Sequence, residues 1–200
     1  MSQVDAVRTP ATAGQVIGAL MAAGISRTAA NILASQSADE TASWQAMYNW
    51  NLGNVTASGS DDYVIESSSN SGHFRAFGSI LDGAQAMVDW VTSRGARAAA
   101  ENGDVASYVQ ALAQHCYLGC IGQTDQTGHV VSQSDYDTYQ ANISSRLPAM
   151  QAAAPVAPPW SMTKMVAVVG GLAAIAFVAA AARENEPWVP RPIRRIAALV

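Results

Sequence analysis

Positive charge is scarce in this chain. Its 11 lysines and arginines are outnumbered by 15 aspartates and glutamates, which gives a formal net charge of −4 over 200 residues. Proteins that bind nucleic acid need Lys and Arg to displace the counterions of the phosphates, so the composition argues against a nucleic-acid partner. The length leaves room for one compact domain of roughly 150 residues plus attachments.

Cysteine is equally scarce, because Cys116 and Cys120 are the only two. They stand four positions apart in what reads as the end of a helix, and no His or Asp lies at zinc-ligand spacing from them. We therefore expect neither a disulfide scaffold nor a metal site. Both side chains are expected to be small apolar fillers of the core.

The N-terminus lacks the form of a signal peptide. Residues Met1 to Thr9 include Asp5 and Arg8, and an amphipathic stretch follows in place of an unbroken apolar run. A secretory signal needs a continuous apolar segment behind a basic start. We therefore expect no cleavable export signal.

Several stretches show the apolar spacing of amphipathic helices. Residues that favour helix N-caps precede them, and a glycine follows the first. One expected helix runs from Thr12 to Gly24, and four more begin after Ser26, Ser79, Asp104 and Ser134. The last carries one stripe of four residues, Tyr136, Tyr139, Ile143 and Leu147.

The helix after Ser26 ends in a carboxylate on its apolar stripe. The stripe consists of Ala29, Ile32, Leu33, Gln36 and Glu40. Glycoside hydrolysis needs a carboxylic acid that keeps its proton near neutral pH, and burial favours the protonated form of a carboxyl. Glu40 has the position for this role, although a Glu at a helix end is often a solvated cap or an ion-pair partner.

Residues 49–77 change in character, because Gly, Ser, Asn and Asp dominate there. Three short pieces within this stretch favour β-structure, at Asn54 to Ala57, Tyr63 to Glu66 and His73 to Phe77. We expect a small, irregular β-hairpin lobe, called the β-lobe below.

The C-terminal part of the chain reads as a spacer and a membrane anchor. Prolines and alanines from Pro148 to Trp160 argue against a regular helix. Met165 to Ala182 is free of charge, and a helix of this length spans about 27 Å, close to the thickness of a bilayer core. Trp160 and Trp188 flank it as interfacial anchors. The predicted organisation is a domain at 1–147, a linker at 148–161, a transmembrane helix at 162–183 and a basic tail at 184–200.

Four motifs occur in the order of a known family. Gln36-x3-Glu40-Thr41 precedes Trp44 and the segment NWNLGN at 49–54. HFRAFGS at 73–79 is similar to an FRxYxS segment of that family. Tyr117, after Ala111-Leu112, is similar to the family's GY turn, and Tyr139-x3-Ile143 is similar to its closing YxxxI helix. Over roughly Thr12 to Leu147 the chain resembles the glucosaminidase-type peptidoglycan hydrolases of the lysozyme-like superfamily.

This resemblance implies a mainly α, lysozyme-like α+β fold, in which a helical domain carries a small β-hairpin lobe beside a cleft. The family's general acid corresponds to Glu40, and Glu66 is similar to a family acid that precedes the FRxYxS segment. Substrate contacts are expected from six side chains: Trp44, Asn51, Asn54, Phe74, Tyr117 and Tyr139. No metal or cofactor is implied.

The sequence also departs from the family pattern. Members commonly have ESGWG where this chain has ETASW at 40–44, so the tight glycine turn is missing. His115 and Cys116 stand where a glycine often precedes the tyrosine. Other interpretations remain open for four residues, namely an exposed strand-end charge for Glu66, a core position for Tyr117 and Tyr139, and a structural ion pair for Arg75.

The sequence thus predicts a peptidoglycan glycosidase that cleaves β-1,4 bonds between GlcNAc and MurNAc in glycan strands. The competing hypothesis is a non-catalytic lysozyme-like module that binds the cell wall or serves as a structural anchor, since a fold does not guarantee its chemistry.

The expected location follows from the anchor. Four arginines follow the uncharged run Met165 to Ala182, and only Lys164 directly precedes it. The positive-inside rule therefore places the tail in the cytoplasm. A C-terminal anchor without an export signal favours a membrane-associated lytic enzyme of a phage virion, in contact with other virion proteins. The alternative is a wall-remodelling protein of the bacterial inner membrane, with its domain in the periplasm.

Overall fold

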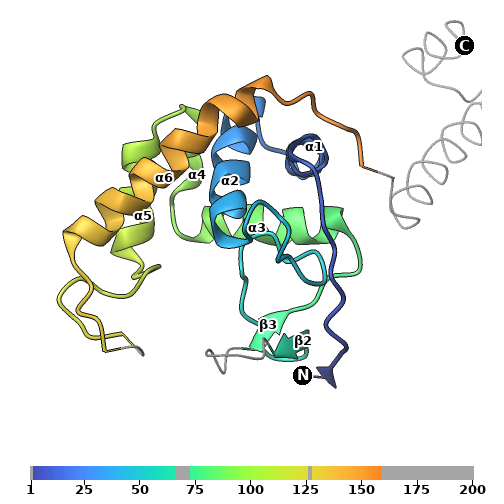
Figure 1. The fold of residues 1–200 in the computed structure, drawn as a ribbon, viewed down its shortest axis with the longest axis horizontal. Helices are drawn as coiled ribbons and strands as arrows, with labels where there is room; N and C mark the ends of the chain where they lie inside the picture. The colour runs from blue at the N-terminus through green and yellow to red at the C-terminus, as the bar shows by residue number, and fades with distance from the viewer. Residues whose placement is uncertain (1, 66–72, 126–127, 159–200) are drawn as a thin grey trace, which may run out of the picture. The chain divides into compact units, whose positions relative to one another are not determined.

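The computed structural model describes residues 2–65, 73–125 and 128–158, and it is mainly helical in these ranges (Figure 1). Its helices are α1 (Ala13–Ala22), α2 (Arg27–Glu40), α3 (Ile80–Ser93), α4 (Arg97–Glu101), α5 (Val105–Gln114) and α6 (Gln133–Ala152). Its strands are β1 (Ser2–Gln3), β2 (Asp62–Ile65) and β3 (His73–Arg75). The expectation of a mainly α domain with a small β-lobe is confirmed.

Side-chain caps set the starts of α1, α2, α3 and α5, at the residues that the sequence predicted. Thr12 forms a capping box with Gln15 at α1, and Ser26 accepts a hydrogen bond from the backbone of Ala29 at α2. Such caps satisfy N–H groups that have no partner within the helix, and each stabilises by about 1 kcal/mol. Helix α6 begins slightly earlier than expected, with Ser132 as its N-cap, and the short helix α4 was not expected.

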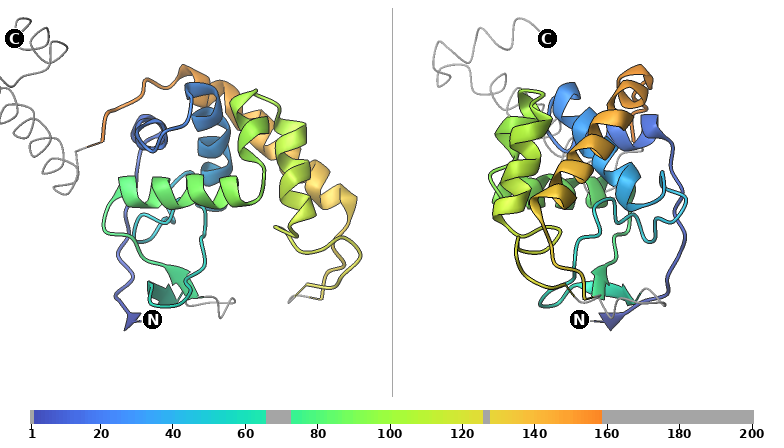
Figure 2. Two further views of the ribbon diagram at one scale, coloured as in Figure 1. Left: turned by 180° about the vertical axis from the view of Figure 1, so that it is seen from behind. Right: turned by 60° about the vertical axis from the view of Figure 1, so that its left-hand side comes forward.

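Helix α2 lies at the centre of the described domain. It packs against α1, α4 and α6, and every residue from Ala29 to Ala38 is buried (Figure 1). Burying a side chain such as Ile32 or Leu33 contributes roughly 1.5–3 kcal/mol each, so this helix anchors the core. Its C-terminal end, where Glu40 lies, points towards the part of the domain that holds the strands (Figure 2).

Helix α3 lies close to the segment NWNLGN. A Cβ atom at Gly83 of α3 would stand 1.9 Å from the carbonyl oxygen of Trp50, so only glycine permits this approach. Leu52, in the middle of the segment, is fully buried. The loop that follows the end of α2 is therefore fixed against α3.

The strands form one small sheet in the order β1-β2-β3. Strands β2 and β3 are antiparallel, with Val64 opposite Phe74, and β1 pairs in parallel with β2. The strand expected at Asn54 to Ala57 does not form, because Asn54 has a left-handed backbone and only Thr56 makes an isolated bridge, to Phe74. The sequence did not predict strand β1, because a strand of two residues is too short to show an alternating pattern.

Helix α6 continues through Pro148, which corrects the expectation that regular helix stops there. Proline removes one helical hydrogen bond. Two contacts stabilise this last turn: Met150 is buried, and the guanidinium of Arg27 donates to three carbonyl oxygens, those of Met150, Gln151 and Ala153. The cost of the proline is therefore offset by tertiary contacts.

The residues after α6 lie against α1. The backbone N–H of Val156 donates to the carbonyl oxygen of Gly14 over 2.8 Å, and a Cβ at Gly18 would stand only 1.7 Å from the carbonyl oxygen of Val156. The two glycines thus let the extended segment approach the helix backbone. The predicted transmembrane helix at 162–183 and the tail at 184–200 lie outside the described residues. No helix of the described ranges is long and apolar enough to cross a membrane.

Candidate active site

Glu40 is the last residue of α2, and its carboxyl is partly buried. The hydroxyl of Tyr139, from α6, donates to Oε1 of Glu40 over 2.7 Å. The side-chain amide of Asn54 lies 3.5 Å from Oε2 and 3.4 Å from the backbone oxygen of the same glutamate. The first and the last of the four predicted motifs therefore meet at one carboxyl.

Tyr117 completes this group. Its ring centroid lies 5.7 Å from that of Tyr139, whose hydroxyl donates to Glu40. Burial raises the pKa of Tyr117 far above its usual value, and the carboxyl of Glu40 adds to the rise. The pKa of Tyr139 is also raised, first by burial and then by Tyr117 and Glu40. Both hydroxyls therefore stay protonated and can donate to a carboxyl at any ordinary pH. We name Glu40, Asn54, Tyr117 and Tyr139 the Glu40 cluster.

A second pair of polar side chains lies in the core near this cluster. The hydroxyl of Tyr108, from α5, donates to Oε1 of Gln36, and both residues are fully buried. Burial raises the pKa of Tyr108, with further contributions from Tyr117 and Glu40. The sequence placed Tyr108 and Gln36 on helical stripes without a functional role. Gln36 is a polar residue one turn before Glu40 on an otherwise apolar stripe, and this feature of the sequence could have indicated a role near Glu40.

The two carboxylates at the end of α2 have different partners. Asp39 forms an ion pair with Arg146 of α6 over 2.9 Å. Glu40 makes no ion pair within the described residues, and its partners there are neutral hydroxyl and amide groups. Asp39 therefore holds α2 to α6, while Glu40 keeps a carboxyl that is not neutralised by a cation.

The turn after Glu40 is tight although it lacks glycine. Ala42, Ser43 and Trp44 have φ angles of 48°, 55° and 63°, in the left-handed region. For residues with a Cβ this conformation costs roughly 1–2 kcal/mol each. The hydroxyl of Thr41 compensates in part, because it accepts from the backbone of Trp44 over 3.1 Å. The chain thus forms a tight turn here from residues that carry a Cβ.

The structure gives two of the expected substrate contacts, Trp44 and Asn51, partners within the protein. Trp44 is only 4% exposed and donates through Nε1 to the hydroxyl of Ser37, so it packs in the core and offers no ring face to a sugar. Asn51 is also buried, and its amide bonds the backbone of Val55 and the carbonyl oxygen of Arg75. Asn51 therefore holds the NWNLGN segment to β3.

The β-lobe contains the remaining expected site residues. Phe74 is partly buried in β3, and Glu66 lies outside the described residues. Arg75 forms an ion pair with Asp61 over 3.3 Å, as expected for a structural role. Phe74 stays a predicted contact, carried by the resemblance.

The cysteines correct another expectation. Cys116 and Cys120 are joined by a disulfide, and their Cα atoms are 4.3 Å apart. Helix α5 ends at Gln114, and the left-handed φ of Cys116 turns the chain back, so the pair does not lie on a helix as we assumed. The disulfide closes a short loop that contains Tyr117.

Trp90 of α3 supports Tyr117 from another side. The two rings meet edge-on with centroids 5.0 Å apart, and the guanidinium of Arg94 lies 4.0 Å from the centroid of Trp90. Sequence reasoning missed this pair, because Trp90 is not on the apolar stripe of α3. The position of Tyr117 is thus fixed by the disulfide loop and by an aromatic contact.

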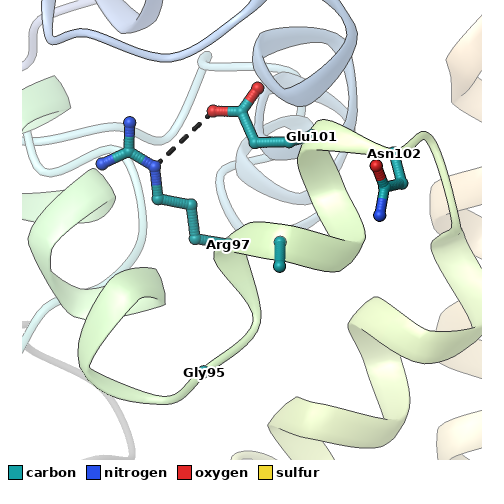
Figure 3. A pocket seen from close by; sticks show the side chains of 5 residues that line it. Gly95, Arg97, Glu101 and Asn102 are labelled. Carbon is teal, nitrogen blue, oxygen red and sulfur yellow. Dashed lines mark ion pairs between the residues drawn. The ribbon is translucent and has the colours of Figure 1, made fainter.

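A hollow of about 500 Å³ beside α4 lacks a carboxyl with only neutral partners like that of Glu40 (Figure 3). The charged groups that line it bond each other or the backbone: Arg97 pairs with Glu101 over 3.5 Å, and the carboxylate of Glu101 accepts from the backbone of Ser26 over 3.1 Å. These contacts hold α4 to the start of α2. Across the part of the chain that the structure describes, no three His, Cys, Asp or Glu side chains gather closely enough to hold a metal ion.

Comparisons with models of known protein families, with curated proteins and with solved structures find no match to this chain. The Glu40 cluster and its surroundings are therefore the basis of the functional argument.

Proposed function

We propose that this domain is a peptidoglycan glycosidase in which Glu40 is the general acid. One observation carries the proposal: Tyr139, from the last motif, meets Glu40 and Asn54, from the first, at one carboxyl, and the ring of Tyr117, from a third motif, lies against Tyr139. Because Tyr139 is 99 residues from Glu40 in the sequence, their meeting is not a consequence of local structure. It supports a common role for the four side chains.

The hydrogen bonds suit a general acid. Tyr139 donates to Oε1 of Glu40, so the transferable proton belongs on Oε2. A general acid needs one oxygen within hydrogen-bond reach of the leaving oxygen and a fixed orientation of the carboxyl. Tyr139 supplies the orientation, and the amide of Asn54 beside Oε2 can bind a hydroxyl or acetamido group of the sugar. The expected substrate is a β-1,4 bond between GlcNAc and MurNAc.

A second carboxylate belongs to the proposal. Glu66 follows β2, and we assign it the stabilisation of the oxocarbenium-like transition state or the activation of water, as the resemblance implies. Asp61 is less suited to this role, since it pairs with Arg75. The effect of Glu66→Gln on turnover separates an obligate partner from an auxiliary charge.

The test is the digestion of purified sacculi by the full chain in mild detergent. Mass spectrometry of the released muropeptides distinguishes new reducing ends of MurNAc, new reducing ends of GlcNAc and 1,6-anhydro products of a lytic transglycosylase. Any of the three products supports a glycosidase. Binding to sacculi without release of glycan fragments by a folded protein would contradict it and favour the wall-binding module.

The proposed location is a membrane-associated position in a phage virion, with the bacterial inner membrane as the alternative. Met165 to Ala182 would provide the tether. Because α6 passes Pro148 and Val156 packs on α1, a truncation for the test should end after Pro158. The full chain should resist alkaline carbonate extraction of membranes and the truncated chain should not. Release of both into the soluble fraction would contradict the tether.

A further inference from the structure

The hydroxyl of Tyr136 bonds two consecutive residues of the disulfide loop. Tyr136 lies on α6, three residues before Tyr139, and it is only 1% exposed. The backbone N–H of Leu118 donates to this hydroxyl over 3.0 Å, and the hydroxyl donates to the carbonyl oxygen of Gly119 over 2.9 Å. One buried hydroxyl therefore provides both an acceptor and a donor to the backbone of the loop.

These two bonds attach the loop to α6. The backbone N–H of Tyr117 bonds the carbonyl oxygen of Leu112, near the end of α5, and the N–H of Gly119 bonds a carbonyl oxygen within the loop. Those bonds fold the loop back onto α5 and onto itself. The hydroxyl of Tyr136, in contrast, joins the loop to the helix that carries Tyr139.

The attachment determines where the ring of Tyr117 lies. Tyr117 directly precedes Leu118, so the bond from Leu118 to Tyr136 limits the movement of its backbone. Its ring centroid lies 5.7 Å from that of Tyr139. Residues three apart on a helix are neighbours on its surface. Tyr136 therefore holds the loop beside the place on α6 where Tyr139 meets Tyr117.

The ring of Tyr139 in turn determines the hydrogen bond to Glu40. Its hydroxyl donates to Oε1 of Glu40 over 2.7 Å. A change of its side-chain rotamer would carry the hydroxyl away from the carboxyl. The ring of Tyr117, packed against that of Tyr139, restricts such a change. The loop therefore keeps the donor of Glu40 in place.

The hydroxyl of Tyr136, rather than its ring, makes the attachment. A phenylalanine at this position would fill the same space in the core. It would leave the N–H of Leu118 and the carbonyl of Gly119 without this partner, and backbone polar groups need partners when they are shielded from water. The loop would then have to move towards solvent, and Tyr117 would move with it.

We propose that Tyr136 is a positioning residue for Glu40: its hydroxyl fastens the disulfide loop to α6, so that Tyr117 holds Tyr139 in the orientation that donates to Glu40. The inference rests on the proposed function. Tyr136 lies outside the motif Tyr139-x3-Ile143, so its role follows from the contacts of its hydroxyl.

The first experiment compares Tyr136→Phe with a core variant in the full chain. Tyr136→Phe keeps the ring and removes both bonds, so kcat on sacculi should fall about 5-fold because the donor to Glu40 is less well aligned. Ile17→Val is the control for lost stability, because it removes one buried methyl group from a different helix. It should keep parental kcat. Melting curves of both variants establish that they are folded.

A double-mutant cycle with Tyr139→Phe tests the route of the effect. If Tyr136 acts through the hydroxyl of Tyr139, its own loss has little left to disturb once that hydroxyl is gone. The double variant should have a kcat within about 2-fold of that of Tyr139→Phe alone. A loss equal to the product of the two single losses would contradict the inference. Parental kcat in folded Tyr136→Phe would also contradict it.

Two NMR measurements on the full chain in detergent micelles do not depend on catalysis. In the parent, the amide hydrogen of Leu118 should exchange slowly with solvent, because it is bonded to a buried hydroxyl. In ¹³C spectra, the signal of the Glu40 carboxyl should shift in Tyr136→Phe and stay in place in Ile17→Val.

The NMR results separate this inference from the proposed function. Rapid exchange at Leu118 overturns the inference even if Tyr136→Phe does not fold. A Glu40 signal that does not respond to folded Tyr136→Phe overturns it whether or not the protein is active. If the parent leaves sacculi intact while both signals behave as expected, the proposed function fails and the positioning of Glu40 by Tyr136 is supported.

Discussion

The hydroxyl of Tyr139 and the carboxyl of Glu40 are 99 residues apart in the sequence and 2.7 Å apart in the fold. Tyr139 lies one turn after the capping box formed by Ser132 and Asp135, so the start of α6 determines where its ring stands. Glu40 is the last residue of α2. The candidate active site is thus built where the C-terminal end of α2 meets the first half of α6.

Tyr139→Phe should lower turnover and leave the fold intact. The change removes one buried hydrogen bond, which costs about 0.5–1.5 kcal/mol of stability, while the ring is kept. Loss of the orienting donor should reduce kcat by about 10-fold. Tyr48→Phe, whose ring lies beside Arg8, is the control and should keep parental kcat. Parental turnover in folded Tyr139→Phe would show that this contact does not orient the acid.

Ala42→Gly should stabilise the domain. Ala42 is exposed and has a φ of 48°, so glycine removes the left-handed strain and disturbs no packing. After subtraction of glycine's extra chain entropy, the free energy of unfolding should rise by roughly 0.5–1 kcal/mol. Urea denaturation measures it. Ala141→Gly, in the exposed interior of α6, should have the opposite effect. Destabilisation by both changes would mean that position 42 is not strained.

Reduction of the Cys116–Cys120 disulfide should lower both stability and turnover. Closing so short a loop is worth about 2 kcal/mol in the chain-entropy model. The loop also holds Tyr117 beside Trp90, so its release should weaken the ring contact of Tyr117 with Tyr139, the residue that donates to Glu40. Melting curves and sacculus digestion with and without dithiothreitol measure the two effects. The Cys116→Ser, Cys120→Ser double variant should match the reduced parent and show no response to the reductant.

The pair formed by His129 and Asp135 should make stability depend on pH. Its atoms Nε2 and Oδ2 are 3.0 Å apart. The hydrogen bond to Asp135 raises the pKa of His129, and the bond from His129 helps to lower the pKa of Asp135 to about 2. The histidine contribution is fully present below its unfolded pKa of about 6.5 and is lost as the pH rises through the folded value. The aspartate contribution is present above about pH 3.9 and is lost as the pH falls towards 2.

His129→Gln should therefore lower the melting temperature more at pH 5.5 than at pH 8.5. Because both groups are well exposed, added salt should reduce the difference between the two pH values. Thermal melts of the parent and the variant in matched buffers test this. An equal loss at both pH values would show that the charged histidine does not contribute.

The sequence predicted well those features that depend on neighbouring residues. Thr12, Ser26 and Asp104 cap helices because their side chains reach N–H groups two or three residues along the chain. Periodicity placed Glu40 and Tyr139 on helical stripes. That they meet was implied only by the resemblance, since spacing on one helix contains no information about another.

Contacts between distant residues explain the errors. Helix α6 passes Pro148 because Arg27, more than 120 residues away, bonds the carbonyl oxygens of its last turn. Trp44 was expected at the sugar because its chemistry suits stacking, but the left-handed turn directs it to Ser37. The disulfide was missed because the helix ends before Cys116.

The most direct test of the central claim compares Glu40→Gln with Asp39→Asn in the digestion of purified sacculi. The two changes each remove one carboxylate at the end of α2, but Asp39 is paired with Arg146 and Glu40 has only neutral partners among the described residues. Glu40→Gln should reduce turnover by about 100-fold or more with little change in stability, because the transferable proton is lost. Asp39→Asn should lose about 1 kcal/mol of stability or less and keep near-parental turnover. Parental turnover in folded Glu40→Gln, or an equal loss in both variants, would contradict the assignment of Glu40 as the general acid.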